Sequence, residues 1–317
     1  MGVNCDKPQR WKRDIALSVD LYNDWFLNFA PTTYREERVR ATADVEAMLD
    51  RTSHLRRLSF QELSEHPSIL FGLRMCTAPP IARDRLVGLA GVPRALVDTM
   101  EKDDCLPPQM SKIALEKAIQ KIVAMIARLV DVDIFTWLAE GRDPTQQEVY
   151  RAATIVADRL CGANANPIIR NAQERRQLGR IKDWLEARRY KDMTGRTDLK
   201  DMSSGTFAFR LNVPGLREDE NRVNIPVDAV VMPRKAEPGQ LPIMIEAKSA
   251  GDFTNTNKRR KEEAAKIGQL KRMHGDAVRY VLFLCGYFDS GYLGYEAAEG
   301  IDWVWEHRMG DLKEFGL

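Results

Sequence analysis

Two carboxylates and one lysine stand among apolar residues in the C-terminal half of this 317-residue sequence. Asp228 lies in the run VNIPVDAVVM, and Glu246 and Lys248 lie in the run LPIMIEAKS. A strand directs alternate side chains to opposite faces, so Glu246 and Lys248 are expected to share one face. Ile243 and Ile245 then lie on the other face, which an apolar core would cover.

The same alternation applies to the run that contains Asp228. One face of this second strand is predicted to hold Ile225, Val227, Ala229 and Val231. Asp228 is then expected on the opposite face. If the two strands pair, the two carboxylates and the lysine converge on one side of a sheet.

Such a cluster of charges indicates a metal site. Two carboxylates a few ångströms apart repel each other by about 4 kcal/mol at an effective dielectric constant of about 20, so they hold a proton unless a cation neutralises them. Mg²⁺ binds hard oxygen ligands, typically one or two carboxylates together with water and phosphate oxygens. We therefore expect Asp228 and Glu246 to bind Mg²⁺. Lys248 would orient or help to deprotonate a water molecule, or stabilise charge on a phosphate.

The elements around these residues predict an α/β (α+β) fold with a mixed β-sheet flanked by helices. Apolar periodicity predicts a helix over 173–190, strands over 205–213, 223–232 and 241–249, a helix over 257–273 and a strand over 279–288. The residues from Trp11 to about Leu160 read as mainly α-helical, with prolines such as Pro31 ending individual helices. The small and turn-favouring residues GANANPIIRN at 162–171 indicate a junction. We accordingly predict an α-helical domain over 1–165 and a second domain over 166–317.

Asp228 followed by Glu246-Ala247-Lys248, on neighbouring predicted strands flanked by helices, resembles the PD-(D/E)xK nuclease superfamily. The resemblance implies that Asp228 and Glu246 are metal ligands and that Lys248 is the catalytic lysine. Pro226-Val227-Asp228 departs from the family's Pro-Asp by one inserted residue. Two longer segments, WKRDIALSVDLYNDWFLNFAPTTYRE and MIEAKSAGDFTNTNKRRKEEAAKIGQLK, further resemble type II restriction endonucleases of the XamI type. The structural alternative is a surface Glu–Lys pair with an unrelated loop aspartate.

Basic residues near the expected site predict contacts with double-stranded DNA. Four of them open the helix that follows Lys248, namely Lys258, Arg259, Arg260 and Lys261. Cations at a helix N-terminus oppose the helix dipole unless they meet an anion such as a phosphate. Neutralisation by Glu262 and Glu263 at helical spacing is the alternative. In the preceding loop Asn255 is a candidate for reading base edges, whereas Asn257 fits better as a helix cap.

A second basic strip extends from Arg170 to Lys191, with eight basic and three acidic residues. Glu186 in this strip is either a further acidic residue of the metal site or, preferably, a surface carboxylate. Gln269 is equally open between support of the site and plain helix surface. The aromatic C-terminal segment GYFDSGYLGYEAAEGIDWVWEH is either core or a dimer surface.

Composition excludes several classes. The formal net charge is only +2, so any anionic partner must meet local patches. Scattered single histidines and five widely spaced cysteines give no zinc or disulfide pattern. No apolar run suggests a signal peptide or a membrane span, and we expect a soluble cytoplasmic protein with no membrane partner.

The predicted function is a Mg²⁺-dependent type II restriction endonuclease that hydrolyses phosphodiester bonds in double-stranded DNA at a specific sequence. A homodimer is expected, because two-fold related copies of one active site most simply cut both strands of a palindrome. The α-helical domain over 1–165 would supply recognition, dimer contacts or both. Two alternatives stay open: a structure-specific nuclease of repair or recombination, and a catalytically silent DNA-binding protein of the same fold.

Overall fold

The computed structural model describes residues 2–254 and 256–317, and for residues 256–260 it describes the backbone only. The chain forms two compact units, one made of residues 1–29 and 170–317 and the other of residues 30–169. We call them the sheet unit and the helical unit and describe each by itself. The predicted division into domains at 165 and 166 stays a prediction.

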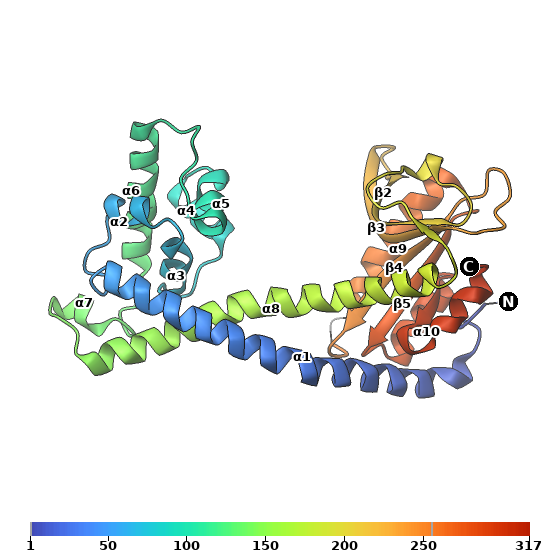
Figure 1. Cartoon of the computed structure of the whole chain (residues 1–317), viewed down its shortest axis with the longest axis horizontal. Coiled ribbons are helices and arrows are strands. Elements are labelled where there is room, and N and C mark those ends of the chain that lie inside the picture. The colour runs from blue at the N-terminus through green and yellow to red at the C-terminus, as the bar shows by residue number, and fades with distance from the viewer. Residues whose placement is uncertain (1, 255) are drawn as a thin grey trace. The chain divides into compact units, whose positions relative to one another are not determined.

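The sheet unit contains a six-stranded mixed sheet whose strands lie in chain order (Figure 1). The strands are β1 (Lys191–Asp192), β2 (Thr206–Leu216), β3 (Arg222–Met232), β4 (Ile243–Ala250), β5 (Arg279–Gly286) and β6 (Asp302–Trp305). β2, β3 and β4 are joined by antiparallel pairings, whereas β1–β2, β4–β5 and β5–β6 are parallel. The expected mixed sheet with flanking helices is therefore confirmed.

Helices cover both faces of this sheet. One face packs against α9 (Thr256–His274), α10 (Ser290–Ala298) and the start of α1 (Pro8–Arg51). The other face packs against the end of α8 (Gln146–Glu186) and the 3₁₀ segment η2 (Glu306–Phe315). A further 3₁₀ turn, η1 (Leu199–Asp201), lies between β1 and β2. We call the two sides the α9 face and the α8 face.

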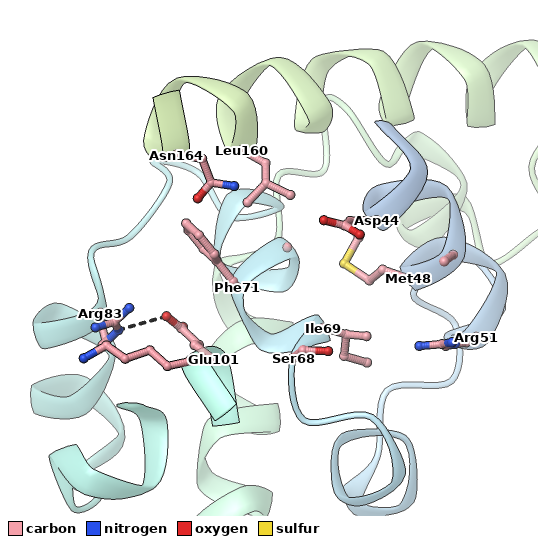
Figure 2. A pocket seen from close by; sticks show the side chains of 13 residues that line it. Asp44, Met48, Arg51, Ser68, Ile69, Phe71, Arg83, Glu101, Leu160 and Asn164 are labelled. Carbon is pink, nitrogen blue, oxygen red and sulfur yellow. Dashed lines mark hydrogen bonds and ion pairs between the residues drawn. The ribbon is translucent and has the colours of Figure 1, made fainter. Parts of the chain in front are cut away.

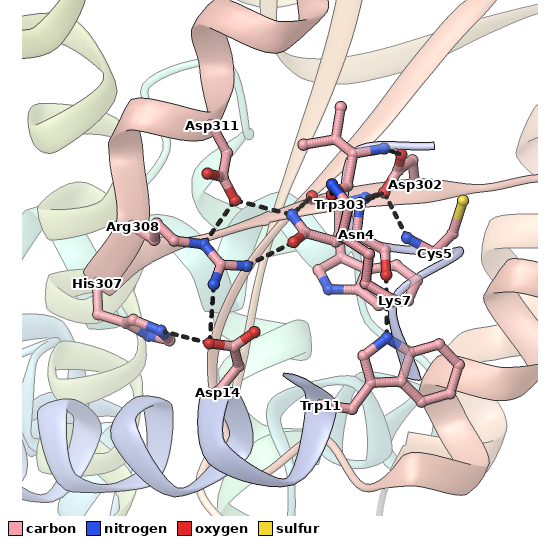
Figure 3. A network of polar contacts seen from close by, with 11 residues as sticks. Asn4, Cys5, Lys7, Trp11, Asp14, Asp302, Trp303, His307, Arg308 and Asp311 are labelled. Carbon is pink, nitrogen blue, oxygen red and sulfur yellow. Dashed lines mark hydrogen bonds and ion pairs between the residues drawn. The ribbon is translucent and has the colours of Figure 1, made fainter. Parts of the chain in front are cut away.

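Polar contacts fix the start of α1 to the end of the chain, as Figure 3 shows. Asn4 donates to the carbonyl of Trp303 at 2.7 Å, and Arg308 donates to Asp14 at 3.0 Å. Further along α1, the Ser18 hydroxyl accepts the N–H of Gly286 at 2.8 Å. Gly286 ends β5 next to Ala250, the last residue of β4, so the contact with Ser18 holds the carboxyl ends of these two strands.

The helical unit confirms the predicted α-helical character of the N-terminal half. Its elements are the remainder of α1, α2 (Phe60–Glu65), α3 (Ile69–Met75), α4 (Arg83–Ala90), α5 (Arg94–Asp103), α6 (Lys112–Leu129), α7 (Thr136–Glu140) and most of α8. A cavity of about 510 Å³ lies among α1, α3, α4, α5 and α8, and Figure 2 shows residues that line it. At its wall Glu101, whose side chain is only 1% exposed, accepts from Arg83 at 2.9 Å and from Arg74 at 2.6 Å.

No helix ends at Pro31 or in the segment 162–171, contrary to prediction. Pro31 lies inside α1, and the segment with Pro167 lies inside α8. The boundary between the two units, at residues 169 and 170, does fall within the predicted junction. A proline in a helix interior costs about 3 kcal/mol. Buried residues on both sides of each proline, such as Ala30 and Ala41 in α1, show that packing of the continuous helix outweighs this cost.

The aromatic C-terminal segment is core in the sheet unit. It forms α10 and β6, and Tyr292, Trp303 and Trp305 are almost fully buried. Among the described residues, no helix combines the length and the apolar composition that a membrane span requires.

Replacement of the fully buried Phe283 in β5, which lies between β4 and β6, tests the importance of this core. We expect Phe283→Ala to lower the free energy of unfolding by about 3–5 kcal/mol, because it leaves a cavity under α8. Urea unfolding followed by tryptophan fluorescence measures the change. The control is Val39→Ala on α1, where the side chain is 72% exposed and little change is expected.

Candidate active site

The alternation predicted for β4 is confirmed. Ile243 and Ile245 belong to the core on the α8 face, and Met244 belongs to the core on the α9 face. Glu246 and Lys248 follow Met244 at two-residue steps, and the Lys248 Nζ donates to Glu246 Oε1 at 3.0 Å. The two charged side chains therefore share the α9 face as an ion pair.

The alternation predicted for β3 is wrong. Ile225 and Val227 pack on the α9 face, whereas Ala229 and Val231 pack on the α8 face. The strand thus changes phase at Asp228, which lies between the two sets. A uniform strand cannot do this, because its side chains alternate with a period of two.

The phase change coincides with an unusual residue on the neighbouring strand. Phe209 pairs with Ala229 and Leu211 pairs with Val227, so Arg210 stands opposite Asp228, where no pair forms. Arg210 has a φ of 52°, a left-handed conformation that costs a non-glycine residue on the order of 1–3 kcal/mol. The irregularity in β2 therefore accompanies the reorientation of β3.

Asp228 reaches β4 as a result. The β3–β4 ladder consists of the pairs Val231–Ile243, Val230–Met244 and Ala229–Ile245. One residue further on, the Asp228 side chain accepts the backbone N–H of Ala247 at 2.8 Å. The three residues that the sequence analysis singled out, Asp228, Glu246 and Lys248, are thus brought together.

The electrostatics of Asp228 reflect this neighbourhood. Burial, and then the negative charge of Glu246, raise the pKa of Asp228 from 3.8 to about 6. The hydrogen bond from Ala247 and the charge of Lys248 oppose the increase without cancelling it. The positive charge near Asp228 and Glu246 is therefore too small to offset the burial of Asp228 and the repulsion between the two carboxylates.

Glu246 is the most buried member of the cluster, with only 3% of its surface exposed. Its Oε1 accepts from both Lys248 and Lys266 of α9, the latter at 2.5 Å. Its Oε2 is buried and has no hydrogen-bond partner at normal geometry among the described residues. The buried Tyr280 hydroxyl of β5 is nevertheless close enough that, after burial, the charge of Glu246 raises the pKa of Tyr280. A buried carboxylate oxygen without a partner is costly, and a bound cation would satisfy it.

The sequence predicts that Glu263 of α9 neutralises basic neighbours on the helix surface, whereas in the structure its side chain points into the interior. It is fully buried, lies 3.6 Å from the Lys248 Nζ and accepts from the Tyr292 hydroxyl at 2.7 Å. Burial opposes protonation of Lys248, but the charges of Glu246 and Glu263 outweigh it and raise the pKa of Lys248. Helical spacing from the buried Ile267 and Leu270 would have identified Glu263 as inward-facing.

The predicted DNA-binding residues are only partly described. Lys261 is exposed at the start of α9. Asn255 and the side chains of Asn257, Lys258, Arg259 and Arg260 lie outside the described residues. Their contacts with DNA stay predictions.

The other candidates lie away from the cluster. Glu186 is exposed and lies 3.7 Å from Lys182. Gln269 lines a surface hollow with Arg217 and Arg272. Within the basic strip of α8, Arg176 is already engaged with Glu306 at 3.1 Å.

The donor set fits a hard divalent cation with few protein ligands. In the described part of the chain, no group of three or more His, Cys, Asp or Glu side chains is arranged to hold a metal ion. Asp228 and Glu246 offer two carboxylates, one with a raised pKa and one with a buried oxygen that lacks a partner. Mg²⁺ binds through one or two carboxylates and completes its shell with water and phosphate oxygens, so the residues present suffice.

Comparison with known proteins agrees with this chemistry. The family model for the XamI restriction endonuclease matches residues 53–305. The type II restriction enzyme SalI of Streptomyces albus G is 53% identical over 318 residues, which cover 99% of each chain. No solved structure gives a significant match. Both matches are to restriction endonucleases, the class of site-specific deoxyribonucleases. The chain belongs to the XamI restriction endonuclease family, and its function as a type II restriction endonuclease, predicted from the sequence, is confirmed.

The raised pKa of Asp228 predicts a pH-dependent gain in stability on replacement by asparagine. A folded-state pKa of about 6 against 3.8 means that the folded state binds more protons over this interval, so Asp228 costs stability as the pH rises through it. Without divalent cations, Asp228→Asn should therefore raise the free energy of unfolding at pH 8 by at most about 3 kcal/mol. The gain should vanish near pH 4. Urea titrations across this range measure it.

The matched control for this measurement is Asp276→Asn, at an exposed position after α9. It should leave the free energy of unfolding unchanged at both pH values. An equal response of the two variants at pH 8 would contradict the assignment of a buried, repelled carboxylate at residue 228.

Proposed function

We propose that this restriction endonuclease hydrolyses phosphodiester bonds of double-stranded DNA with Mg²⁺ at Asp228, Glu246 and Lys248, in a core of the PD-(D/E)xK type. The observation that carries the proposal is the pair of carboxylates next to a lysine, with a buried Glu246 oxygen that no described residue satisfies. The order of the elements, α8, β2, β3, β4, α9 and β5, agrees with the helix and strand order inferred from the sequence.

Each residue has a separate role in this proposal. Asp228 and Glu246 hold the metal ion. When bound, Mg²⁺ polarises the phosphoryl group and lowers the pKa of a water molecule. Lys248 points its ammonium at Glu246 Oε1 and has 19% of its side chain exposed, so a phosphate can approach it. It stabilises the charge that develops on the phosphate or orients the attacking water.

Neighbouring residues hold this arrangement in place. The N–H of Ala247 fixes one oxygen of Asp228, and Lys266 fixes one oxygen of Glu246. Gln177 of α8 donates to the carbonyl of Lys248 at 3.2 Å from the other face of the sheet. The backbone of β4 is thus held from both faces at the residues that act on the substrate.

The proposal extends to the partners. Lys258, Arg259, Arg260, Lys261 and Asn255 are proposed to contact the DNA, on the strength of their charge and their position in sequence after β4. A homodimer is proposed because each chain supplies one such site, whereas a duplex has two strands to cut. The cytoplasm is the proposed location, and the five cysteines, all among the described residues, are free thiols as a reducing compartment requires.

Loss of a catalytic group should abolish cleavage and spare binding. Purified wild-type protein should cut a mapped plasmid into discrete fragments with Mg²⁺ and leave it intact with EDTA. Asp228→Ala and Lys248→Ala should each lower the cleavage rate by at least about 100-fold, because these groups act in the transition state more than in binding. Specific binding, measured by gel shift in Ca²⁺, should change by less than about fivefold.

Lys235→Ala is the matched control, since Lys235 is an exposed lysine in the segment between β3 and β4. It should cut at the wild-type rate. If Asp228→Ala and Lys248→Ala cut as fast as this control, the proposed site is wrong. If both unfold or lose binding to the same degree as cleavage, the three residues are a structural ion-pair cluster instead.

Sedimentation of the protein with a duplex that contains one recognition site tests the dimer. Two chains per duplex are expected, because two copies of one active site then face the two strands. A single bound chain that cuts both strands in one binding event would contradict the dimer and leave the active-site assignment untouched.

A further inference from the structure

Arg210 combines a strained backbone with an exposed charge beside the proposed active site. Its φ of 52° lies in the left-handed region, although it is a long-chain residue in the interior of β2. Strained conformations persist where the surrounding structure imposes them, and they concentrate at functional sites. A glycine at this position would adopt the same φ without strain.

The register places Arg210 directly opposite Asp228. The flanking pairs, Phe209 with Ala229 and Leu211 with Val227, form on both sides of it. The left-handed residue therefore occurs at the single step where β3 changes phase and Asp228 turns to the N–H of Ala247. Strain in β2 and the orientation of a proposed metal ligand in β3 belong to one local arrangement.

The charges around Arg210 indicate which ligand it meets. Its side chain is 64% exposed, and the guanidinium donates to Glu174 of α8 at 2.8 Å. The charge of Glu174 is also one of those that raise the pKa of Asp228, so this ion pair lies within electrostatic reach of the proposed metal ligand. An exposed ion pair of this kind is weak and is readily exchanged for a stronger partner.

A phosphate is such a partner. The planar guanidinium binds phosphate through two parallel hydrogen bonds, which are stronger than those between neutral groups. Lys248 and Lys266 both donate to Glu246, so they lie on the β4 side of the carboxylate pair. Arg210 adds positive charge on the β2 side, next to the negative charges of Glu174 and Asp228.

We propose that Arg210 exchanges Glu174 for a backbone phosphate of the DNA strand being cut and so positions that strand at Asp228. The inference rests on the proposed active site and adds to it a phosphate-binding residue on a neighbouring strand. The strained backbone at Arg210 is then retained because it holds both this guanidinium and Asp228 at the substrate.

Arg210→Gly separates function from fold, because glycine keeps the backbone conformation and removes the guanidinium. The melting temperature should fall by no more than about 2 °C, since relief of strain offsets the loss of an exposed ion pair. Single-turnover cleavage at saturating protein should slow by about 10- to 100-fold. The slope of log Kd for the DNA against log salt concentration should decrease in magnitude by about 0.9, as expected for one lost phosphate contact. Arg210→Lys, which retains the charge without the two parallel bonds, should fall between Arg210→Gly and the wild type in cleavage rate.

Two control variants match the two properties of Arg210. Glu220→Gly relieves another left-handed residue, with a φ of 62° in the turn after β2, and should leave cleavage unchanged. Arg222→Ala removes an exposed arginine at the start of β3 and should also cleave at the wild-type rate.

Cleavage by Arg210→Gly at the wild-type rate with an unchanged salt slope would overturn the proposal. So would a loss of stability with binding and cleavage reduced alike, because that result would give Arg210 a purely structural role. Failure of the active site itself gives a different result: Asp228→Ala would then cut as fast as the wild type, whatever Arg210→Gly does.

Discussion

Repulsion between two carboxylates in one buried place is the constraint on which the site depends. Adjacent strands bring Asp228 and Glu246 together, and burial, followed by the charge of Glu246, raises the pKa of Asp228. Neighbouring groups compensate in part: the N–H of Ala247 for Asp228, and two lysines for one oxygen of Glu246. The other oxygen of Glu246 has no such partner among the described residues, so a bound cation would stabilise the arrangement.

A regular sheet would not give this proximity. Had β3 kept its alternation through Asp228, the strand would present one uniform apolar face, as the sequence suggests. Instead, the side chains of β3 change the face to which they point opposite Arg210, which has a left-handed backbone. Just beyond the last β3–β4 pair, the side chain of Asp228 accepts a hydrogen bond from the N–H of Ala247 in β4. Local backbone strain in β2 thus accompanies the placement of the Asp228 carboxylate in β3. This kind of coupling between strands depends on three-dimensional packing more than on any one residue.

The sequence predicts those features that repeat with a simple period. The alternation in β4 placed Glu246 and Lys248 on one face, and apolar runs located β2 to β5 and α9 to within a few residues. Helix ends were wrongly predicted at Pro31 and in the segment 162–171, because burial of side chains along a continuous helix outweighs the cost of a proline in its interior. The phase change at Asp228 could not be predicted, since it follows from the conformation of a residue on another strand. The role of Glu263 was within reach, because its spacing from Ile267 and Leu270 marks it as inward-facing, but the adjacent cluster of charges suggested a solvated surface.

The path of the chain through its two units has a consequence for synthesis on the ribosome. The helical unit, residues 30–169, is continuous in sequence and is complete before β2 emerges. The sheet unit joins residues 1–29 to residues 170–317. Asn4, for example, donates a hydrogen bond to the carbonyl of Trp303, which is synthesised almost three hundred residues later. A nascent chain can therefore fold its helical unit while residues 1–29 still lack the later segment 170–317, so the sheet unit can form only after its last strands have been synthesised.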